Sequence, residues 1–295
     1  MNDVYQRVTD SIVRQLDAGV APWIKPWAGV SEPIPVNATT GRPYRGINHL
    51  MLQMEGTARG LDRNAWLTFG QAVAIGGRIR KGSHGVQIVF FQLRERVGED
   101  GSAISDGDRR RIPLLRTFTV FPLVDVEGLP DEYYQPPAVP VWDGNARAEG
   151  LIAASGANVC HGGNRAFFRP ADDLIQLPER GAFRSADDYF STALHELVHW
   201  TSAPKRCERQ LGRRFGDDAY AAEELIAELG AAFLCAHCHI DGQLQHANYI
   251  DSWLRVLHSD KRAVFTAAAK AQQAADFILA LNAKSDESES MPQAA

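Results

Sequence analysis

Apolar residues recur along this chain with a helical period at both ends and in strand-like runs in the middle. Residues 3–18 place apolar side chains three and four positions apart, which predicts an amphipathic helix that ends before Gly19. The same helical spacing recurs in four further segments. These predicted helices cover residues 49–60, 145–156, 220–239 and roughly 246–281, the last with a break near His258–Asp260.

Strand-like segments lie between these helices. GVQIVFFQLRERV and PLLRTFTVFPLVDV predict two strands of a long hairpin, separated by the polar loop EDGSAISDGDRRRI. AFFRPADDLIQLP predicts a second, shorter β-ribbon that turns at Pro170 and Asp172–Asp173. A segment rich in proline and acidic residues, GLPDEYYQPPAVPVWDG, predicts a linker between the two regions.

We therefore expect an α+β protein of two domains. The first would be an α+β domain over residues 1–128, followed by a linker over 129–143. The second would be mostly helical with a small antiparallel sheet over 144–283, and the polar residues 284–295 would form a disordered tail.

Composition indicates a soluble globular protein. The 295 residues are 45% hydrophobic and 23% charged, and no stretch of 18 residues is continuously apolar. The N-terminus has no signal-peptide pattern, so we expect a cytoplasmic protein without a membrane partner. Four cysteines are too few for a disulfide scaffold at this length, and CAHCH at 235–239 resembles a haem-attachment pattern only superficially, because it continues a predicted buried helix.

The segment STALHELVHW carries the most specific chemistry of the chain. On a helix His195 and His199 lie on the same face one turn apart, so both imidazoles can reach one metal ion. Glu196 points about 100° away from His195, which suits a general base that acts on water at the metal rather than a third ligand.

A third ligand is expected from YAAEELIAELGAAFLCAH. Glu224 and Glu228 share one face of an otherwise apolar helix, where carboxylates are costly unless they are paired or bind metal. We assign Glu224 as the ligand and Glu228 as the acceptor of a hydrogen bond from a ligand histidine, although the reverse assignment is also compatible with the sequence. A third alternative is two helices joined by His–Glu hydrogen bonds without metal. A His/His/Glu set suits Zn²⁺, and also Mn²⁺, Co²⁺ or Ni²⁺.

These residues resemble the zincin metallopeptidases of the gluzincin type, in which HExxH is followed by a glutamate ligand. The resemblance implies a zinc-dependent peptidase. Glu228 departs modestly from the Asp or Asn that is more common four residues after that ligand. In such enzymes the strand before the metal helix commonly pairs with extended substrate, so the resemblance implies that LIQLP is an edge strand that captures peptide.

Positive charge is concentrated in the first part of the chain. Residues 1–120 contain 16 Lys+Arg and 11 Asp+Glu, whereas residues 121–295 contain 15 and 25. Basic residues bind phosphates and aromatic faces stack on unpaired bases, so this pattern favours single-stranded nucleic acid over a duplex as the partner. The candidate contacts are Trp23, Trp27, Arg42, Arg45, Arg78, Arg80 and Lys81.

The segments PWIKPW, NATTGRPYRGIN, AWLTFGQAVAIGGRIRKG and HELVHW, in this order, resemble the ArdC family of plasmid antirestriction proteins along nearly the whole chain. The resemblance implies a single-stranded-DNA-binding domain, a zincin domain behind it, and protection of incoming DNA from host restriction during conjugation. A host restriction-system protein is then a candidate substrate or target. The alternative is a non-enzymatic DNA-binding protector whose metal site is structural.

Overall fold

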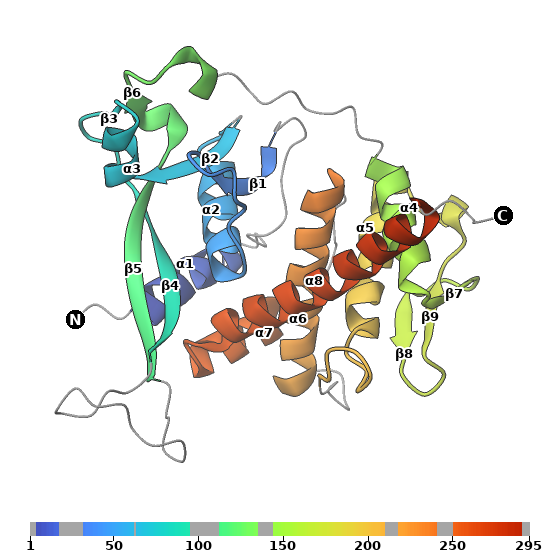
Figure 1. The fold of residues 1–295 in the computed structure, drawn as a ribbon. Helices are drawn as coiled ribbons and strands as arrows, with labels where there is room; N and C mark the ends of the chain where they lie inside the picture. The colour runs from blue at the N-terminus through green and yellow to red at the C-terminus, as the bar shows by residue number, and fades with distance from the viewer. Residues whose placement is uncertain are drawn as a thin grey trace, which may run out of the picture.

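The chain folds into two adjoining halves, one built around a four-stranded sheet and one built mainly from helices (Figure 1). This α+β architecture agrees with the expectation from the sequence. The computed structural model describes residues 4–17, 32–61, 63–94, 112–134, 144–209, 218–240 and 250–290. Trp23 and Trp27, two of the candidate DNA contacts, lie outside the described residues.

The N-terminal half contains one larger sheet, with strand order β1-β2-β5-β4, and a two-stranded ribbon of β3 and β6. Strands β4 and β5 pair antiparallel along the whole of β4, as the predicted hairpin requires, whereas the parallel pair of β1 with β2 was not predicted. The elements of this half are α1 (Val4–Asp17), β1 (Glu32–Asn37), α2 (Ile47–Ala58), β2 (Arg63–Thr68), α3 (Phe69–Ala74), β3 (Arg78–Ile79), β4 (Val86–Arg94), β5 (Ile112–Pro122), η1 (Leu123–Asp125), β6 (Val126–Glu127) and η2 (Asp131–Tyr133).

Local side-chain contacts explain where these elements begin and how the sheet ends. Thr68 and Gln71 form a capping box at the start of α3, which turns strand β2 directly into a helix. Strand β4 lies at the edge of the sheet, and the Asn48 side chain both donates to the Val89 carbonyl at 2.7 Å and accepts from the Val89 amide at 2.9 Å. Helix α2 therefore satisfies part of an edge that would otherwise be open for pairing.

In the described residues of the C-terminal half, five α-helices pack with a small sheet. Its sheet has the order β7-β9-β8, with β9 parallel to β7 and antiparallel to β8. The elements are α4 (Gly144–Ser155), β7 (Asn158–His161), β8 (Phe167–Arg169), β9 (Leu174–Leu177), η3 (Arg180–Ala182), α5 (Ala186–Trp200), α6 (Asp218–Cys238), α7 (Ile250–Ser259) and α8 (Ala263–Ser290).

The prediction that LIQLP forms an edge strand is wrong. This segment is β9, the central strand of the sheet, and its residues pair on both sides. The cause is strand β7, whose short sequence NVCH carries no alternating pattern and was not predicted. Both lateral edges of β9 are thus already occupied, and it cannot pair with a substrate peptide.

Two segment boundaries differ from the expectation. Residues up to Tyr134, placed in the linker by their composition, pack onto the N-terminal half: Leu129 is buried, and the Tyr134 hydroxyl donates to the Val126 carbonyl at 2.9 Å. At the other end, α8 continues to Ser290, whereas the polar residues from 284 onward were expected to be disordered. The predicted break before this helix is observed, between α7 and α8.

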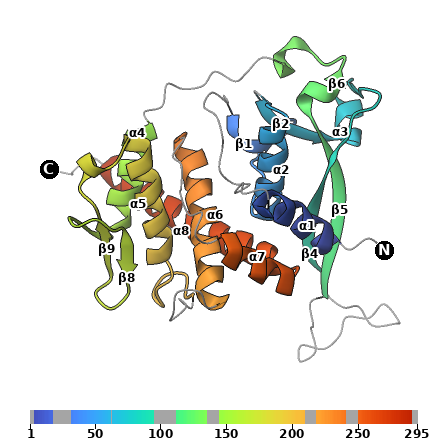
Figure 2. The ribbon, with the colours of Figure 1, turned by 180° about the vertical axis from the view of Figure 1, so that it is seen from behind.

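One of the hydrophobic clusters extends from one half into the other. Buried residues of α1, α2 and β4 belong to the same apolar cluster as those of α5 to α8. Helix α1 packs against α7, which Figure 2 shows from behind, and α2 packs against α8. The two halves therefore share buried surface and are not connected only through the linker. None of the described helices is long and apolar enough to span a bilayer.

Candidate metal centre

Helix α5 presents the two histidines of HELVHW on a buried face. Ser185 caps the helix by accepting a hydrogen bond from the Asp188 amide at 3.1 Å. His195 and His199 follow one turn apart, both buried, with ring centroids 4.8 Å from each other. Helical geometry alone therefore brings the two imidazoles to one place.

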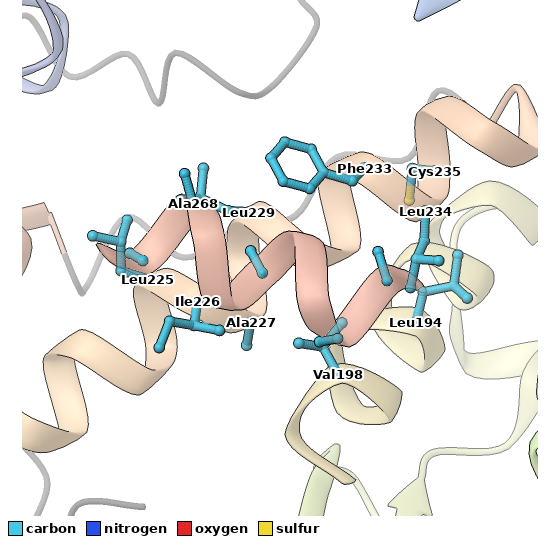
Figure 3. Packing of buried hydrophobic residues seen from close by; sticks show 14 of the residues in the cluster. Leu194, Val198, Leu225, Ile226, Ala227, Leu229, Phe233, Leu234, Cys235 and Ala268 are labelled. Atoms are coloured by element: carbon cyan, nitrogen blue, oxygen red, sulfur yellow. The ribbon is translucent and has the colours of Figure 1, made fainter. Parts of the chain in front are cut away.

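Helix α6 lies against α5 through tightly packed apolar side chains. Figure 3 shows Leu194 and Val198 of α5 close to the apolar residues of α6. The helices approach so closely at Gly230 that a Cβ atom there would lie 2.9 Å from both methyl carbons of Val198. This contact fixes the spacing of the two helices that carry the polar site.

The carboxylate of Glu224 on α6 faces both histidines. The Nε2 atom of His195 lies 3.6 Å from Glu224 Oε2, and the Nε2 atom of His199 lies 3.5 Å from Glu224 Oε1. One ligand atom from each of the three residues lies within 4.8 Å of the others. The structure thus brings His195, His199 and Glu224 together.

These distances fit a divalent metal ion better than direct hydrogen bonds. Hydrogen bonds between nitrogen and oxygen are usually 2.7–3.2 Å long, shorter than both contacts. Two ligand atoms held about 2.1 Å from a tetrahedral ion are about 3.4 Å apart. Each histidine lies at a similar distance, 3.5 or 3.6 Å, from one of the two oxygens of Glu224. Because two imidazoles and one carboxylate are also the ligands of many catalytic zinc sites, the residues present fit a divalent metal.

A buried ion pair that the sequence did not reveal supports one of the histidines. The Nδ1 atom of His199 lies 3.4 Å from Glu223 Oε1, on the side of the ring away from Glu224. Arg209 in turn donates to both oxygens of Glu223, at 2.8 and 3.0 Å, and its side chain is only 2% exposed. A carboxylate that accepts from Nδ1 fixes the ring and leaves Nε2 free to bind metal.

The charges around His199 change its protonation. Burial disfavours the charged imidazole, but the carboxylates of Glu223, Glu224 and Glu196 outweigh this and raise the pKa of His199 to about 10. Burial favours a raised pKa for Glu224, but His195 and His199 outweigh it and lower the pKa of this carboxyl. The site thus concentrates negative charge around the imidazoles, and a bound cation would neutralise it.

The remaining predicted residues of the site also lie in this region. Glu196 is buried on α5, directly after His195, and Glu228 is 1% exposed on α6, one turn after Glu224. The structure thus places Glu224, and not Glu228, in the group of three converging ligand atoms. Cys235 and Cys238 further along α6 are buried, as expected for a buried helix, and burial raises the pKa of the Cys238 thiol to about 12.

The described candidates for DNA contacts lie at the surface of the N-terminal half. Arg42 and Lys81 are exposed. Arg78 and Arg80 are 83% and 55% exposed and share one partner, Glu127, at 3.2 Å. Arg45 forms an ion pair with Asp276 of α8, so this arginine links the two halves of the protein.

Two family models match the chain, one on each half. Residues 2–121 match the N-terminal domain of the anti-restriction factor ArdC, and residues 146–270 match a zincin-like metallopeptidase. The second range includes His195, His199 and Glu224.

Similar proteins cover nearly the whole chain. The protein y4eC of Sinorhizobium fredii is 39% identical over 287 residues, which cover 94% of this chain and 91% of y4eC. Two Escherichia coli proteins named DNA primase TraC are 39% and 38% identical over 95% and 98% of this chain, which spans only 20% and 28% of their length.

Crystal structures of the antirestriction protein ArdC from plasmid R388 have the same fold. The metal-free structure superposes with a TM-score of 0.81 and 36% identity, over 96% of this chain and 98% of ArdC. An Mn(II)-bound structure of ArdC superposes with a TM-score of 0.78 over 95% and 98% of the two chains.

Proposed function

The chain belongs to the ArdC family of antirestriction proteins, and from this membership we propose that it is a metal-dependent peptidase that acts at single-stranded DNA and protects that DNA from restriction. The observation that carries the enzymatic part is the convergence of His195, His199 and Glu224 beside Glu196. The donor set favours Zn²⁺, and the Mn(II)-bound ArdC structure supports Mn²⁺ as an alternative.

In this proposal each residue has a distinct role. His195 and His199 hold the metal through Nε2, and Glu224 holds it through its carboxylate. The bound metal supplies a Lewis acid that makes water nucleophilic near neutral pH. Glu196 accepts the proton of the attacking water and transfers it to the leaving amine. Glu223 holds the His199 ring, and Arg209 holds Glu223.

The DNA-binding part of the proposal rests on the exposed basic residues of the N-terminal half. Arg42, Arg78, Arg80 and Lys81 can contact phosphates, and Glu127 can release Arg78 and Arg80 when a phosphate replaces it. Because Arg45 already binds Asp276, it contributes to DNA binding only if that ion pair opens. A host restriction-system protein bound near the DNA is the proposed substrate.

The variant Glu196→Gln tests whether peptide hydrolysis is part of the function. We expect it to bind metal and single-stranded DNA as the wild type does, and to lose both hydrolysis of a restriction-system protein and antirestriction. The measurements are metal content, DNA affinity, cleavage followed by gel electrophoresis, and survival of unmodified DNA in a restricting host. Asp260→Asn, an exposed acidic residue after α7, is the matched control.

If Glu196→Gln still binds metal and retains full antirestriction, the result would contradict the proposed peptidase function. That result would favour the second candidate, a DNA-binding protector whose metal only stabilises the fold.

A further inference from the structure

The β4–β5 hairpin carries an exposed pair of aromatic side chains that the core does not use. Phe90 is 52% exposed and Phe118 is 44% exposed, and their ring centroids lie 6.4 Å apart in an edge-to-face arrangement. Ile88 and Val120, on the same face of the hairpin, are buried in a separate apolar cluster with Trp66. The aromatic pair continues this face beyond the point where the core ends.

The strand register places an arginine beside the two rings. Arg116 is the direct partner of Phe90 across the β4–β5 pair, and directly opposed residues point to the same face of a sheet. Arg116 is exposed. The sequences of the two strands, VQIVFFQLR and IPLLRTFTVFP, contain two arginines and no acidic residue. The surface around the aromatic pair is therefore both apolar and positively charged.

The position of the β4–β5 hairpin in the molecule also suits the binding of a ligand. Figure 1 shows β4 and β5 as a long twisted ribbon on the side of the N-terminal half that is remote from the small sheet of the C-terminal half. The inner part of this ribbon packs on α2, and the edge of β4 is held there by Asn48. The aromatic pair thus lies on a strand pair that is fixed in position, which reduces the entropy cost of binding a ligand there.

We propose that Phe90, Phe118 and Arg116 form a binding site for single-stranded DNA, in which the two rings stack on unpaired bases and the guanidinium contacts a phosphate. The inference rests on the proposed DNA-binding function and gives it a definite surface, separate from the basic loop with Arg78 and Arg80.

The chemistry of the surface favours single-stranded DNA over other occupants. Every base has a π face that can stack on phenylalanine, and duplex DNA hides these faces in its own stack. A second protein copy docking through apolar contacts alone would gain nothing from the positive charge of Arg116. An arginine beside open aromatic faces matches the alternation of base and phosphate along a single strand.

The test compares binding of two probes, an oligothymidine of about 20 nucleotides and an abasic strand of equal length. This length is chosen because it exceeds the site size of typical single-strand-binding folds. Binding is measured by fluorescence anisotropy over a series of salt concentrations. The double variant Phe90→Leu with Phe118→Leu keeps apolar side chains but removes the π faces. We expect it to bind oligothymidine at least about tenfold more weakly, and to bind the abasic strand as the wild type does.

Arg116→Gln probes the phosphate contact. It should weaken binding to both probes and lower the slope of log affinity against log salt concentration by about 0.7, the value for one phosphate contact on a single strand. Two controls accompany these variants. Thr117→Ala alters an exposed residue on the opposite face of β5, and Phe69→Leu alters an exposed phenylalanine on α3. Both should bind as the wild type does.

The outcomes separate this inference from the function on which it rests. If the wild type binds neither probe, the proposed DNA-binding function fails. If the wild type binds but the double leucine variant binds oligothymidine equally well, the stacking site is wrong. An equal loss of oligothymidine affinity in Phe69→Leu would also overturn the stacking site. So would a double leucine variant that changes its oligomeric state and keeps its DNA affinity.

Discussion

At the scale of single residues, the buried pair of Glu223 and Arg209 is the feature that most distinguishes this site from a bare HExxH sequence. Glu223 contacts His199 with one oxygen and receives hydrogen bonds from Arg209 on both. Removing one member of such a pair leaves an uncompensated buried charge, so the pair contributes both to the orientation of His199 and to the stability of the fold.

We predict that Glu223→Gln weakens metal binding about 10- to 100-fold, because the amide keeps the size of the side chain but loses the charge that polarises His199. Affinity is measured by competition with a chelator. Glu149→Gln removes the same charge from an exposed ion pair with Arg180 and should leave metal affinity unchanged. Wild-type affinity in Glu223→Gln would show that this carboxylate only compensates the charge of Arg209.

Glu224 can be recognised as a site residue from the sequence, whereas Glu223 cannot, and the reason is physical. A carboxylate on an apolar helix face is conspicuous, whereas its neighbour, turned by 100°, is expected to point toward solvent. Glu223 is 3% exposed because Arg209 lies against it, and Arg209 comes from a segment without a periodic pattern. Only the tertiary structure could bring these two residues together.

At the scale of elements, the metal site depends on how closely α5 approaches α6. Helix α6 was predicted from its periodicity, and the spacing of His195 and His199 placed them on one face of a second helix. The spacing of the two helices was not predictable, because it is set by the contact of Gly230 with Val198, and an isolated glycine in a helical pattern carries no information about its neighbour. Strand β7 was missed for a similar reason, since four residues are too few to show a period.

We predict that Gly230→Ala destabilises the protein by about 1–3 kcal/mol and weakens metal binding, because the added methyl group forces the two helices apart. Thermal unfolding and chelator competition measure the two effects. Gly150→Ala in α4 is the matched control, since its Cβ would lie 3.5 Å from Asn282 Oδ1, an ordinary contact. That variant should gain up to about 1 kcal/mol from better helix propensity.

Combining Val198→Ala with Gly230→Ala should restore much of the metal affinity that Gly230→Ala alone loses. The reason is that Val198→Ala removes the two methyl groups that the new side chain meets. If Gly230→Ala is as stable as wild type and binds metal equally well, the spacing of the helices is not set at this contact.

At the scale of the whole molecule, the two halves are joined by contacts that the charge asymmetry of the sequence did not suggest. Opposite net charge and a linker rich in proline predicted separate modules. In the structure His49 of α2 packs against Phe233 of α6 with ring centroids 4.5 Å apart, and the amide of Gly46 donates to Gln272 of α8 at 3.0 Å. The halves are therefore expected to unfold as one cooperative unit.

The burial of His49 at this junction predicts a pH dependence of stability. Burial lowers the pKa of His49 from 6.5 to about 4, so between these values the unfolded chain binds a proton that the folded protein excludes. Above pH 6.5 His49 is neutral in both states and the free energy of unfolding is at its full value. As the pH falls from 6.5 toward 4, the free energy of unfolding decreases by up to about 3 kcal/mol.

Urea unfolding at pH 7.5 and pH 5 measures this effect. His49→Leu should lose less stability on acidification than the wild type does, whereas His258→Leu, at an exposed position of α7, should follow the wild type. An identical pH dependence in His49→Leu and wild type would contradict a neutral, buried His49 at the junction.

The proposed activity depends on one divalent metal held by His195, His199 and Glu224, and metal content measured by mass spectrometry is the decisive test. Wild type, His195→Ala, Glu224→Ala and Glu228→Gln are purified gently and reloaded with Zn²⁺ or Mn²⁺, and circular dichroism confirms that each is folded. We predict about one equivalent of metal in wild type and in Glu228→Gln, and a loss of metal in the other two variants. Metal retained by Glu224→Ala but lost from Glu228→Gln, or no metal in reloaded wild type, would contradict the site.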